Sequence, residues 1–396
     1  MKKKIAILGS TGSIGDNTLK IFKKDIKNFE IILLTTNKNY KKLLRQAKIF
    51  KVKNVIIYNY DCYKKFKKLN RKKYLKIFHN TRDFIKHNTK KIDYTMCAIS
   101  GISGLAPTLE LIKHSRKIAI ANKESIICAW NLIQKRLKSF KTNFVPVDSE
   151  HFSIWMLNNG SNYKNIEKIY ITASGGPFLN YSKKKFNSIT PLKAAKHPNW
   201  KMGKKISIDS STLMNKVFEV IEAQRIFDID KSKFKILTHP ESYVHSLIKY
   251  NNGVTKVLVH DTNMTIPIFN SIYDTDDKKI LKTNSLNIKK MNNLNFKEVD
   301  IKRFPLIKII NKIPKKISLF ETVLISANDT LVEMFLNQKI KYLDIQKILV
   351  YILDLPEFSK YKQISPKNLK DIINLNKRVR LKIQALSVIS TRKWKF

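Results

Sequence analysis

A short apolar run that ends in a glycine-rich turn constrains the fold of this chain most. Residues 4–8 read Lys-Ile-Ala-Ile-Leu and lead into Gly-Ser-Thr-Gly-Ser-Ile-Gly at 9–15, after which helical spacing links Ile14, Thr18, Ile21 and Phe22. A strand, a glycine turn and a helix in this order form a phosphate cradle, because small residues let the backbone approach and the helix N-terminus offers free N–H groups. The glycines read GxxGxxG, so a tight turn without a ligand is the alternative.

Strand-like and helix-like patterns alternate through the first 145 residues. Further strand-like runs occupy residues 31–35, 55–58, 94–99, 117–121 and 143–147. Helical patterns such as Leu43, Ala47 and Phe50 lie between them. This alternation predicts an α/β fold whose N-terminal domain, residues 1–148, is a Rossmann-like, doubly wound parallel sheet.

The end of the second strand indicates which dinucleotide this sheet binds. An NAD site places an acidic residue there, whereas this chain reads Thr-Thr-Asn-Lys-Asn at 35–39. A lysine and amide groups without a carboxylate favour a 2′-phosphate, so we expect NADPH. Asn122-Lys123-Glu124 follows another strand, at the edge where open α/β sheets bind ligands. Lys123 is therefore a candidate contact, with a solvated helix cap as the alternative.

Two carboxylates in the stretch Pro-Val-Asp-Ser-Glu-His at 146–151 are candidate metal ligands. In an extended backbone, Asp148 and Glu150 leave the same face. Two such oxygen donors, with the hydroxyl of Ser149 between them, suit a hard divalent cation such as Mg²⁺ or Mn²⁺. A strand end or helix cap with solvated acids is the alternative.

Two loops carry groups that an anionic substrate needs. Ser174 and the two glycines after it form either an anion nest or a plain turn. The stretch His-Pro-Asn-Trp-Lys-Met-Gly at 197–203 reads as a mobile lid (about 196–205), in which Trp200 excludes water and His197 donates to a phosphate. A surface loop with one half-buried tryptophan is the alternative to the lid.

One helix is predicted over residues 210–227, with an apolar stripe at Met214, Val217, Phe218 and Ile221. A second stripe is polar and consists of Asn215, Glu219 and Glu222, with Lys216 at its edge. Glu219 is expected to complete a three-carboxylate metal site, while Ser210, Asn215 and Lys216 suit a phosphate. The alternative is a solvated face with a Lys216–Glu219 pair.

The rest of the chain is expected to complete an α+β catalytic domain and to add a helical bundle. A strand at 235–238 and a hairpin at 246–260 belong to the catalytic domain, residues 149–275. His245, and less so His239, are minor site candidates, because a lone histidine is usually structural. Residues 276–299 read as a linker and 300–396 as a helical bundle, with helical patterns at 306–313, 320–336, 343–353 and 366–396.

The net charge of +47, from 77 basic and 30 acidic residues, raises the rival hypothesis of a nucleic-acid-binding protein. Such a protein would bind DNA or RNA with a steep salt dependence. The lysines are spread along the whole chain and no nucleic-acid motif accompanies them, so we expect no nucleic-acid partner. Three cysteines fit no zinc or disulfide spacing, and no apolar run approaches about 18 residues, so a cytoplasmic protein without a membrane anchor is expected.

Six stretches together resemble the 1-deoxy-D-xylulose 5-phosphate reductoisomerase family over nearly the whole chain. They are 9–15, 122–124, 146–151, 174–178, 197–203 and 209–216. The resemblance implies conversion of 1-deoxy-D-xylulose 5-phosphate to 2-C-methyl-D-erythritol 4-phosphate in the non-mevalonate route to isoprenoids. It also implies NADPH, a divalent metal (Mn²⁺, Mg²⁺ or Co²⁺) and a homodimer.

The resemblance also assigns residues to roles. It implies metal binding by Asp148, Glu150 and Glu219, and catalytic roles for these three with Lys123 and His197. It implies substrate contacts at Lys123, Ser149, Glu150, Ser174, His197, Ser210, Asn215, Lys216 and Glu219. It implies cofactor contacts at Thr11, Gly12, Ser13, Ile14, Asn37, Lys38, Asn39, Asn122, Glu124 and Gly203. Three residues depart from the family pattern: Asn37 replaces a usual glycine, Glu241 a glutamine and Asp329 a glutamate.

Two questions stay open at this point. The residues do not distinguish a retro-aldol and aldol sequence from a concerted shift, nor do they identify a general acid or base. A different NADP-dependent dehydrogenase, acting on a phosphorylated aldehyde, would also explain the first domain. That enzyme would need another nucleophile, and no cysteine follows Cys128.

Overall fold

The computed structural model describes residues 2–69, 75–160, 162–200, 202–273 and 279–390. The chain forms two compact units, each assembled from several segments. Unit 1 comprises Met1–Ser125, Leu132–Phe152 and Asn263–Thr283. Unit 2 comprises Ile126–Asn131, Ser153–Thr262 and Asn284–Phe396. Apart from the linker, which is corrected below, the domain boundaries expected from the sequence stay a prediction.

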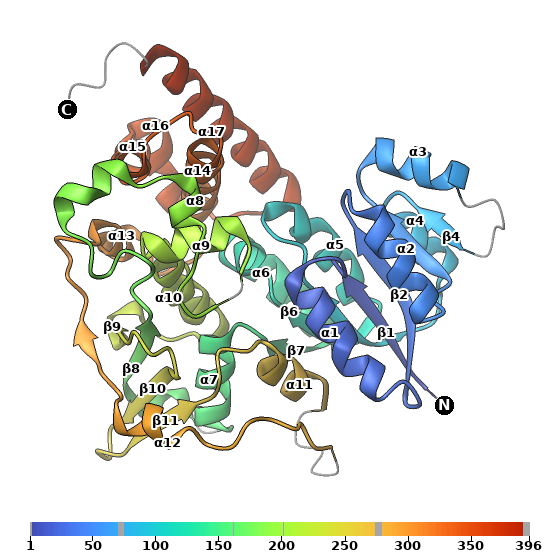
Figure 1. The fold of residues 1–396 in the computed structure, drawn as a ribbon. Helices are drawn as coiled ribbons and strands as arrows, with labels where there is room; N and C mark the ends of the chain where they lie inside the picture. Colours follow the sequence, from blue (N-terminus) through green and yellow to red (C-terminus); the bar gives the residue numbers. More distant parts are fainter. Residues whose placement is uncertain (1, 70–74, 161, 201, 274–278, 391–396) are drawn as a thin grey trace. The chain divides into compact units, whose positions relative to one another are not determined.

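Unit 1 is built on a seven-stranded sheet in the order β4-β3-β2-β1-β5-β6-β7, and every neighbouring pair is parallel (Figure 1). The strands are β1 (Lys3–Leu8), β2 (Phe29–Thr36), β3 (Asn54–Ile57), β4 (Lys76–Phe78), β5 (Ile92–Cys97), β6 (Ser115–Ile120) and β7 (Asn143–Pro146). A parallel sheet covered on both faces buries nearly every side chain, which is why residues 5–8 are all apolar and fully buried. The expected α/β fold class is confirmed.

Helices follow the strands of unit 1 and complete its core. They are α1 (Ser13–Lys24), α2 (Tyr40–Ile49), α3 (Tyr60–Leu69), α4 (Thr81–His87), α5 (Leu105–Ile112), α6 (Lys123–Phe140) and α11 (Thr265–Tyr273). Phe22 of α1 and Ile268 of α11 pack in one core with Ile7, Leu34 and Met96 of the sheet. Helix α6 contributes a middle segment to unit 2.

Unit 2 contains a five-stranded mixed sheet in the order β11-β10-β8-β9-β12. The strands are β8 (Ile166–Ala173), β9 (Phe234–Thr238), β10 (Val244–Tyr250), β11 (Thr255–Val259) and β12 (Lys297–Glu298). The expected hairpin is present, because β10 pairs antiparallel with β11. The expected linker at 276–299 is wrong in part: β12 pairs with β9 and α12 (Ile288–Asn292) lies within it, while residues 276–278 fall outside the described residues.

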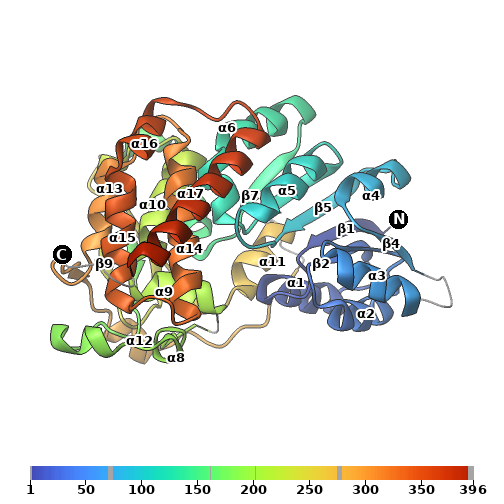
Figure 2. The same cartoon turned by 90° about the horizontal axis from the view of Figure 1, so that it is seen from above.

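Some of the remaining helices of unit 2 pack against this sheet, and the others form a helical layer (Figure 2). They are α7 (Ser149–Asn158, which begins in unit 1), α8 (Pro191–Ala194), α9 (Lys204–Ser211), α10 (Met214–Phe227), α13 (Ile309–Lys312), α14 (Phe320–Leu336), α15 (Tyr342–Asp354), α16 (Pro356–Ser359) and α17 (Leu369–Ser390). The prediction of one helix over 210–227 is wrong. Leu213 adopts φ +58°, a left-handed conformation that ends α9 and starts α10.

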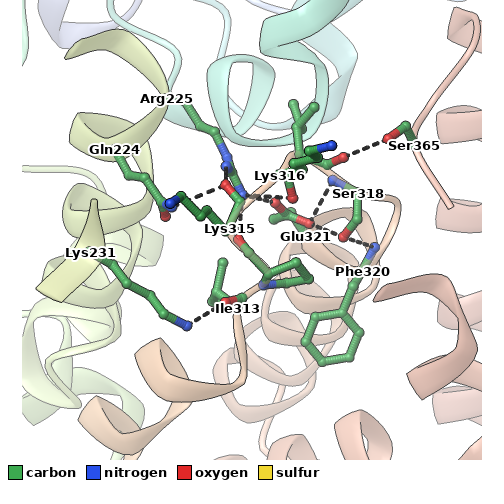
Figure 3. A network of polar contacts seen from close by, with 12 residues as sticks. Gln224, Arg225, Lys231, Ile313, Lys315, Lys316, Ser318, Phe320, Glu321 and Ser365 are labelled. Carbon is green, nitrogen blue, oxygen red and sulfur yellow. Dashed lines mark hydrogen bonds and ion pairs between the residues drawn. The ribbon is translucent and has the colours of Figure 1, made fainter. Parts of the chain in front are cut away.

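A buried polar network fixes the last turn of α10 (Figure 3). The guanidinium of Arg225 pairs with the carboxylate of Glu321 in the first turn of α14, and both side chains are almost fully buried. Arg225 also donates to the carbonyl oxygens of Pro314 (3.1 Å) and Lys315 (2.6 Å). The network therefore joins α10 to the chain segment that leads into α14.

None of the described helices is both long enough and apolar enough to cross a membrane.

Candidate active site

The glycine turn of unit 1 brings the first turn of α1 against β1. Gly9 adopts φ +78°, and a Cβ there would lie 2.6 Å from the carbonyl oxygen of Ala98. A Cβ on Gly15 would lie 2.5 Å from the carbonyl oxygen of Gly9. Neither position accommodates a side chain, so the turn stays tight, and Gly12 and Ser13 at the start of α1 remain exposed. This is the geometry of a phosphate cradle.

Hydrogen bonds connect the cradle to the end of β2. The backbone N–H of Gly9 donates to Thr35 Oγ1 (2.8 Å), and the hydroxyls of Thr11 and Thr36 lie 2.7 Å apart. The corner residues that follow, Asn37, Lys38 and Asn39, are exposed. The predicted phosphate cradle and the predicted 2′-phosphate corner are thus neighbours in one unit.

Helix α2 begins at this corner. Asn39 Oδ1 accepts from the backbone N–H of Lys42 (3.2 Å), so Asn39 caps the helix. Asn37 is not among the described non-glycine residues with positive φ, so the turn does not require the left-handed backbone that a glycine would offer. The side-chain oxygen of Asn39 is occupied by the cap, while its amide remains for a ligand.

Lys42 is a residue that sequence reasoning missed. Its ammonium pairs with the carboxylate of Asp16 and donates to the carbonyl oxygen of Thr11 (3.0 Å). Gln46 donates to the other oxygen of Asp16 (2.9 Å). The ammonium therefore lies against the cradle itself. Its position in the first turn after the corner was the only available sequence signal.

The two acids of unit 1 lie at the start of a helix, and the predicted extended segment is wrong. Strand β7 ends at Pro146, and the carbonyl of Asp148 accepts from the N–H of Phe152 (2.8 Å), which starts α7. The polar groups of Ser149 and Glu150 thus fall in the first turn, where the helix dipole favours a carboxylate. Glu150 is only 7% exposed, which disfavours the alternative of solvated acids.

Each of these acids has a donor at hydrogen-bond distance. Lys123 Nζ lies 2.7 Å from Asp148 Oδ2, and the hydroxyl of Ser149 donates to Glu150 Oε2 (2.7 Å). Lys123 is held at the start of α6 by Asn122, whose Oδ1 accepts from the N–H of Ser125 (2.8 Å). The Asn122 amide in turn donates to the carbonyl of Gly101 (2.8 Å). Asn122 therefore acts as a helix cap that points Lys123 at Asp148.

In unit 2, a loop after β8 approaches α9 closely. Gly176 adopts φ +66°, and a Cβ there would lie 2.8 Å from Ser211 Cα and 2.9 Å from the carbonyl oxygen of Ser210. The N–H of Gly176 donates to Ser174 Oγ (3.1 Å). Ser174 and Ser210, both predicted to bind the substrate, therefore lie on backbone segments that touch.

The proton positions around His197 follow from its partners. His197 Nδ1 faces the backbone N–H groups of Asn199 (3.2 Å) and Trp200 (3.0 Å), so Nδ1 must accept. The ring proton then lies on Nε2, which donates to Ser174 Oγ (3.0 Å). Because Ser174 Oγ accepts from His197 and Gly176, its own proton is left to point at a ligand. Burial, together with the charge of Lys216, lowers the pKa of His197 to about 4, so the ring is neutral at pH 7.

Helix α10 supplies the remaining predicted residues. Asn215, Lys216 and Glu219 lie near its N-terminal end and are all at least nine-tenths buried. The alternative of a solvated face is therefore wrong, although the Lys216–Glu219 pair that it named is present. Lys216 Nζ lies 2.6 Å from Glu219 Oε2, and the amide of Asn215 donates to Glu219 Oε1. The carboxylate of Glu219 is therefore buried with a cation at one oxygen and an amide donor at the other.

The comparisons with known proteins decide the family. Family models of 1-deoxy-D-xylulose 5-phosphate reductoisomerase match residues 5–130, and two C-terminal domain models of the same enzyme match 144–227 and 260–382. The curated 1-deoxy-D-xylulose 5-phosphate reductoisomerase of Pelagibacter ubique is 58% identical over 388 residues, covering 98% of this chain and 100% of that relative. The chain belongs to the 1-deoxy-D-xylulose 5-phosphate reductoisomerase family. The family and enzyme class expected from the sequence are confirmed.

Other members of the reductoisomerase family agree. The enzyme of Clostridium novyi is 37% identical, covering 96% of this chain and 97% of the relative. The Zymomonas mobilis enzyme solved with NADPH is 32% identical with a TM-score of 0.85, covering 98% of this chain and 99% of its own. A DOX-P reductoisomerase solved with NADPH, fosmidomycin and magnesium is 30% identical with a TM-score of 0.90, at the same coverage.

Two more predicted residues, Gly203 and Glu124, and one that was not predicted, His151, remain to be placed. Gly203 caps α9, where its carbonyl accepts from the N–H of Ser207 (3.1 Å), and Lys201 of the predicted lid lies outside the described residues. Glu124, predicted to contact the cofactor, is buried in the first turn of α6. His151, to which the sequence gave no role, places Nδ1 4.0 Å from Asp148 Oδ2.

His197 is expected to titrate with a midpoint near pH 4. Because this pKa lies below the value of 6.5 for an exposed imidazole, the unfolded chain binds the proton more readily than the folded one. The contribution of this ring to stability is therefore complete above pH 6.5 and is lost as the pH falls toward 4. An NMR titration of the imidazole signals, assigned by comparison with His197→Gln, measures the midpoint. A midpoint at or above 6.5 would contradict the neutral, Nε2-protonated ring.

Proposed function

We propose that the protein catalyses the NADPH-dependent rearrangement and reduction of 1-deoxy-D-xylulose 5-phosphate to 2-C-methyl-D-erythritol 4-phosphate. Membership of the reductoisomerase family supports this activity, and the donor cluster around Ser174 is the structural observation that carries it. In one unit, hydroxyl, imidazole, amide and ammonium groups lie on Ser174, His197, Asn215 and Lys216. Such a set suits the phosphate of a small sugar phosphate.

Phosphate binding fixes the substrate at its unreactive end. The ammonium of Lys216 supplies positive charge, and the hydroxyl proton of Ser174 is available to the phosphate. Ser210 lies on the backbone segment that touches the loop of Ser174 at Gly176. His197 holds Ser174 in this orientation and donates no charge of its own. The phosphate contacts stay the same throughout the reaction. Their binding energy is therefore available to hold the ketone end of the substrate in the reactive orientation.

Asp148, Glu150 and Glu219 would hold a divalent metal such as Mg²⁺, Mn²⁺ or Co²⁺. The donor chemistry fits, because the three are carboxylates of low exposure whose oxygens now rest against groups that an ion would replace. A bound ion supplies Lewis-acid stabilisation of negative charge on substrate oxygens. Without the ion, Lys123 lies within ion-pair distance of Asp148 and Lys216 within ion-pair distance of Glu219, so each cation marks an oxygen that the ion would take over. We propose that the acids of unit 1 and unit 2 meet around the ion.

NADPH would bind at the carboxyl edge of the sheet in unit 1. The first turn of α1 suits the pyrophosphate, and Lys38 with the amides of Asn37 and Asn39 suits the 2′-phosphate. Lys42 offsets the negative charge of Asp16 beside the cradle. The proposed lid, about residues 196–205, would close over the substrate and keep water from the reacting carbonyl.

A coupled assay tests this function. The protein with NADPH, Mn²⁺ and 1-deoxy-D-xylulose 5-phosphate should lose nicotinamide absorbance, and a chelator should stop the loss until metal is restored. Omission of the sugar phosphate is the control for non-specific oxidation. No oxidation with metal and substrate present would remove the proposed activity.

We also propose that the protein is a homodimer that works in the cytoplasm. The dimer is supported by β11, which lies at one edge of the second sheet and exposes Val257, with Val254 exposed just before it. An edge strand with exposed apolar side chains readily pairs with a second copy. The three cysteines, whose spacing fits no disulfide framework, support a reducing compartment.

Val257→Asp is expected to convert the dimer to a monomer, because a charge on the edge strand opposes pairing with a second copy. Light scattering after size-exclusion chromatography measures the mass. Leu381→Asp is the matched control, since this exposed leucine lies on α17 and its variant should remain dimeric. A monomeric wild type, or a dimeric Val257→Asp variant, would contradict the β11 interface.

A further inference from the structure

Two histidine rings stack face to face at one end of the second sheet. The ring centroids of His245 and His260 lie 3.8 Å apart with an interplanar angle of 18°, and both side chains are buried. His260 directly follows β11. The pairing of β10 with β11 shifts between Val244 and Ser246, so His245 occupies a β-bulge. Bulges turn a side chain away from its regular direction and are common beside active sites.

Backbone carbonyls fix both rings. His245 Nε2 lies 3.1 Å from the carbonyl oxygen of His260, and His260 Nδ1 lies 2.7 Å from the carbonyl oxygen of Asp261. A carbonyl can only accept, so His245 carries a proton on Nε2 and His260 carries one on Nδ1. The hydrogen bond that each ring N–H donates therefore fixes the orientation of that ring. We call the stacked rings of His245 and His260 the histidine pair.

The proposed lid contacts this histidine pair through Trp200. The ring of Trp200 meets that of His245 edge to face, with centroids 5.9 Å apart at 71°. The neighbouring Asn199 donates its amide to the carbonyl of Pro240 (2.6 Å) and to Ser242 Oγ (2.8 Å). The same short loop carries His197, whose ring orients Ser174 in the donor cluster around that serine. Displacement of Trp200 would therefore displace His197.

We propose that His260 is a positioning residue for the lid. Its ring stacks on His245 and so holds His245 in contact with Trp200 of the lid. The inference rests on the proposed function, in which residues 197–200 close over the phosphate. The ring of His260 stacks on His245, and His245 contacts Trp200, so the effect of His260 on the loop passes through these two rings. Loss of the His260 ring removes one aromatic contact beneath the lid and leaves the cofactor cradle untouched.

The test compares three variants with the wild-type enzyme. His260→Ala removes the stack and should raise the KM for the sugar phosphate about three- to tenfold, the worth of one aromatic pair, with the KM for NADPH unchanged. His260→Phe keeps a flat ring and should restore most of the substrate KM. In a Trp200→Phe background, His260→Ala should raise the KM for the sugar phosphate by a smaller factor than it does in the wild type, because both substitutions act through the contact between Trp200 and His245.

A second readout does not depend on turnover. Acrylamide should quench the Trp200 contribution to fluorescence more strongly in His260→Ala than in the wild type, with Trp200→Phe protein supplying the background of the other tryptophans. An unchanged substrate KM and unchanged quenching in a folded His260→Ala variant would overturn the proposal. Equal losses of thermal stability and of both KM values in the Ala and Phe variants would show a purely structural role and also overturn it. If the wild type has no activity but the quenching difference is as expected, the proposed function would be rejected. The proposal that His260 positions the loop of Trp200 would still be supported.

Discussion

Glu219→Gln is expected to abolish turnover while leaving NADPH affinity nearly unchanged. Glutamine preserves the volume and the hydrogen bond from Asn215 but removes the charge that a divalent ion needs. Groups that only support a metal ligand are worth about 10–100-fold in metal affinity, so loss of a ligand itself should exceed about 100-fold. Metal-dependent NADPH oxidation and fluorescence titration of NADPH separate the two effects.

Glu222→Gln is the matched control for this experiment. Glu222 lies on the same helix, three residues further on, and is as buried as Glu219 (2% against 1% exposed). The substitution makes the same chemical change at an equally buried position, and because Glu222 is not one of the three proposed metal ligands it should keep activity within a fewfold of wild type. Full activity in Glu219→Gln, or equal loss in both variants, would refute the assignment of Glu219 to a three-carboxylate metal site.

The sequence predicted the sheet of unit 1 because parallel strands produce a strong local signal. Strands buried on both faces are continuous apolar runs, and the glycine turn marks where the first one ends. Strand β4 was missed, since its three residues, Lys76–Phe78, are too few to show a period. The sheet of unit 1 could therefore be predicted, apart from one short strand.

The candidate site was predicted by residue type but not by local conformation. Asp148 and Glu150 were expected on one extended strand, yet the helix begins between them, because two-residue spacing does not distinguish a strand from the first turn of a helix. The break at Leu213 was also missed. Helix α10 is buried on nearly every side, so its polar and apolar stripes carried no information about where it starts.

Contacts between distant residues left no signal in a single sequence. Asn199 meets Ser242, and His245 meets His260, only because the strands of unit 2 fold beside the loop. His245 is aimed by a bulge in the pairing of two strands, and the position of a bulge does not follow from hydrophobic alternation. Such contacts required the three-dimensional structure.

Arg225→Met is expected to destabilise the protein by about 3–5 kcal/mol, the loss typical when a buried ion pair is broken from one side. The change leaves the carboxylate of Glu321 buried without its cation and removes the donor from the carbonyls of Pro314 and Lys315. Burial raises the pKa of Glu321, and the charge of Arg225 opposes that rise. Urea unfolding followed by circular dichroism measures the loss.

The pH dependence should change with the stability. A carboxyl whose folded pKa lies above its unfolded value of 4.5 binds the proton more tightly in the folded state, so stability falls as the pH rises through the interval between the two values. Without Arg225 the folded pKa of Glu321 rises further and this interval widens. The Arg225→Met variant should therefore lose more stability between pH 4.5 and neutrality than the wild type does.

Glu321→Gln is the informative partner variant, because the two sides of the pair are not equivalent. Arg225 keeps its carbonyl partners when Glu321 loses its charge, whereas Glu321 loses its cation and keeps only neutral donors, among them Ser318, when Arg225 is removed. The loss in Glu321→Gln should therefore be smaller, about 1–3 kcal/mol, the penalty of an imperfectly paired buried group. A larger loss in Glu321→Gln than in Arg225→Met would show that the carbonyls do not hold the guanidinium. Losses below about 1 kcal/mol in both would mean that this network does not fix the end of α10.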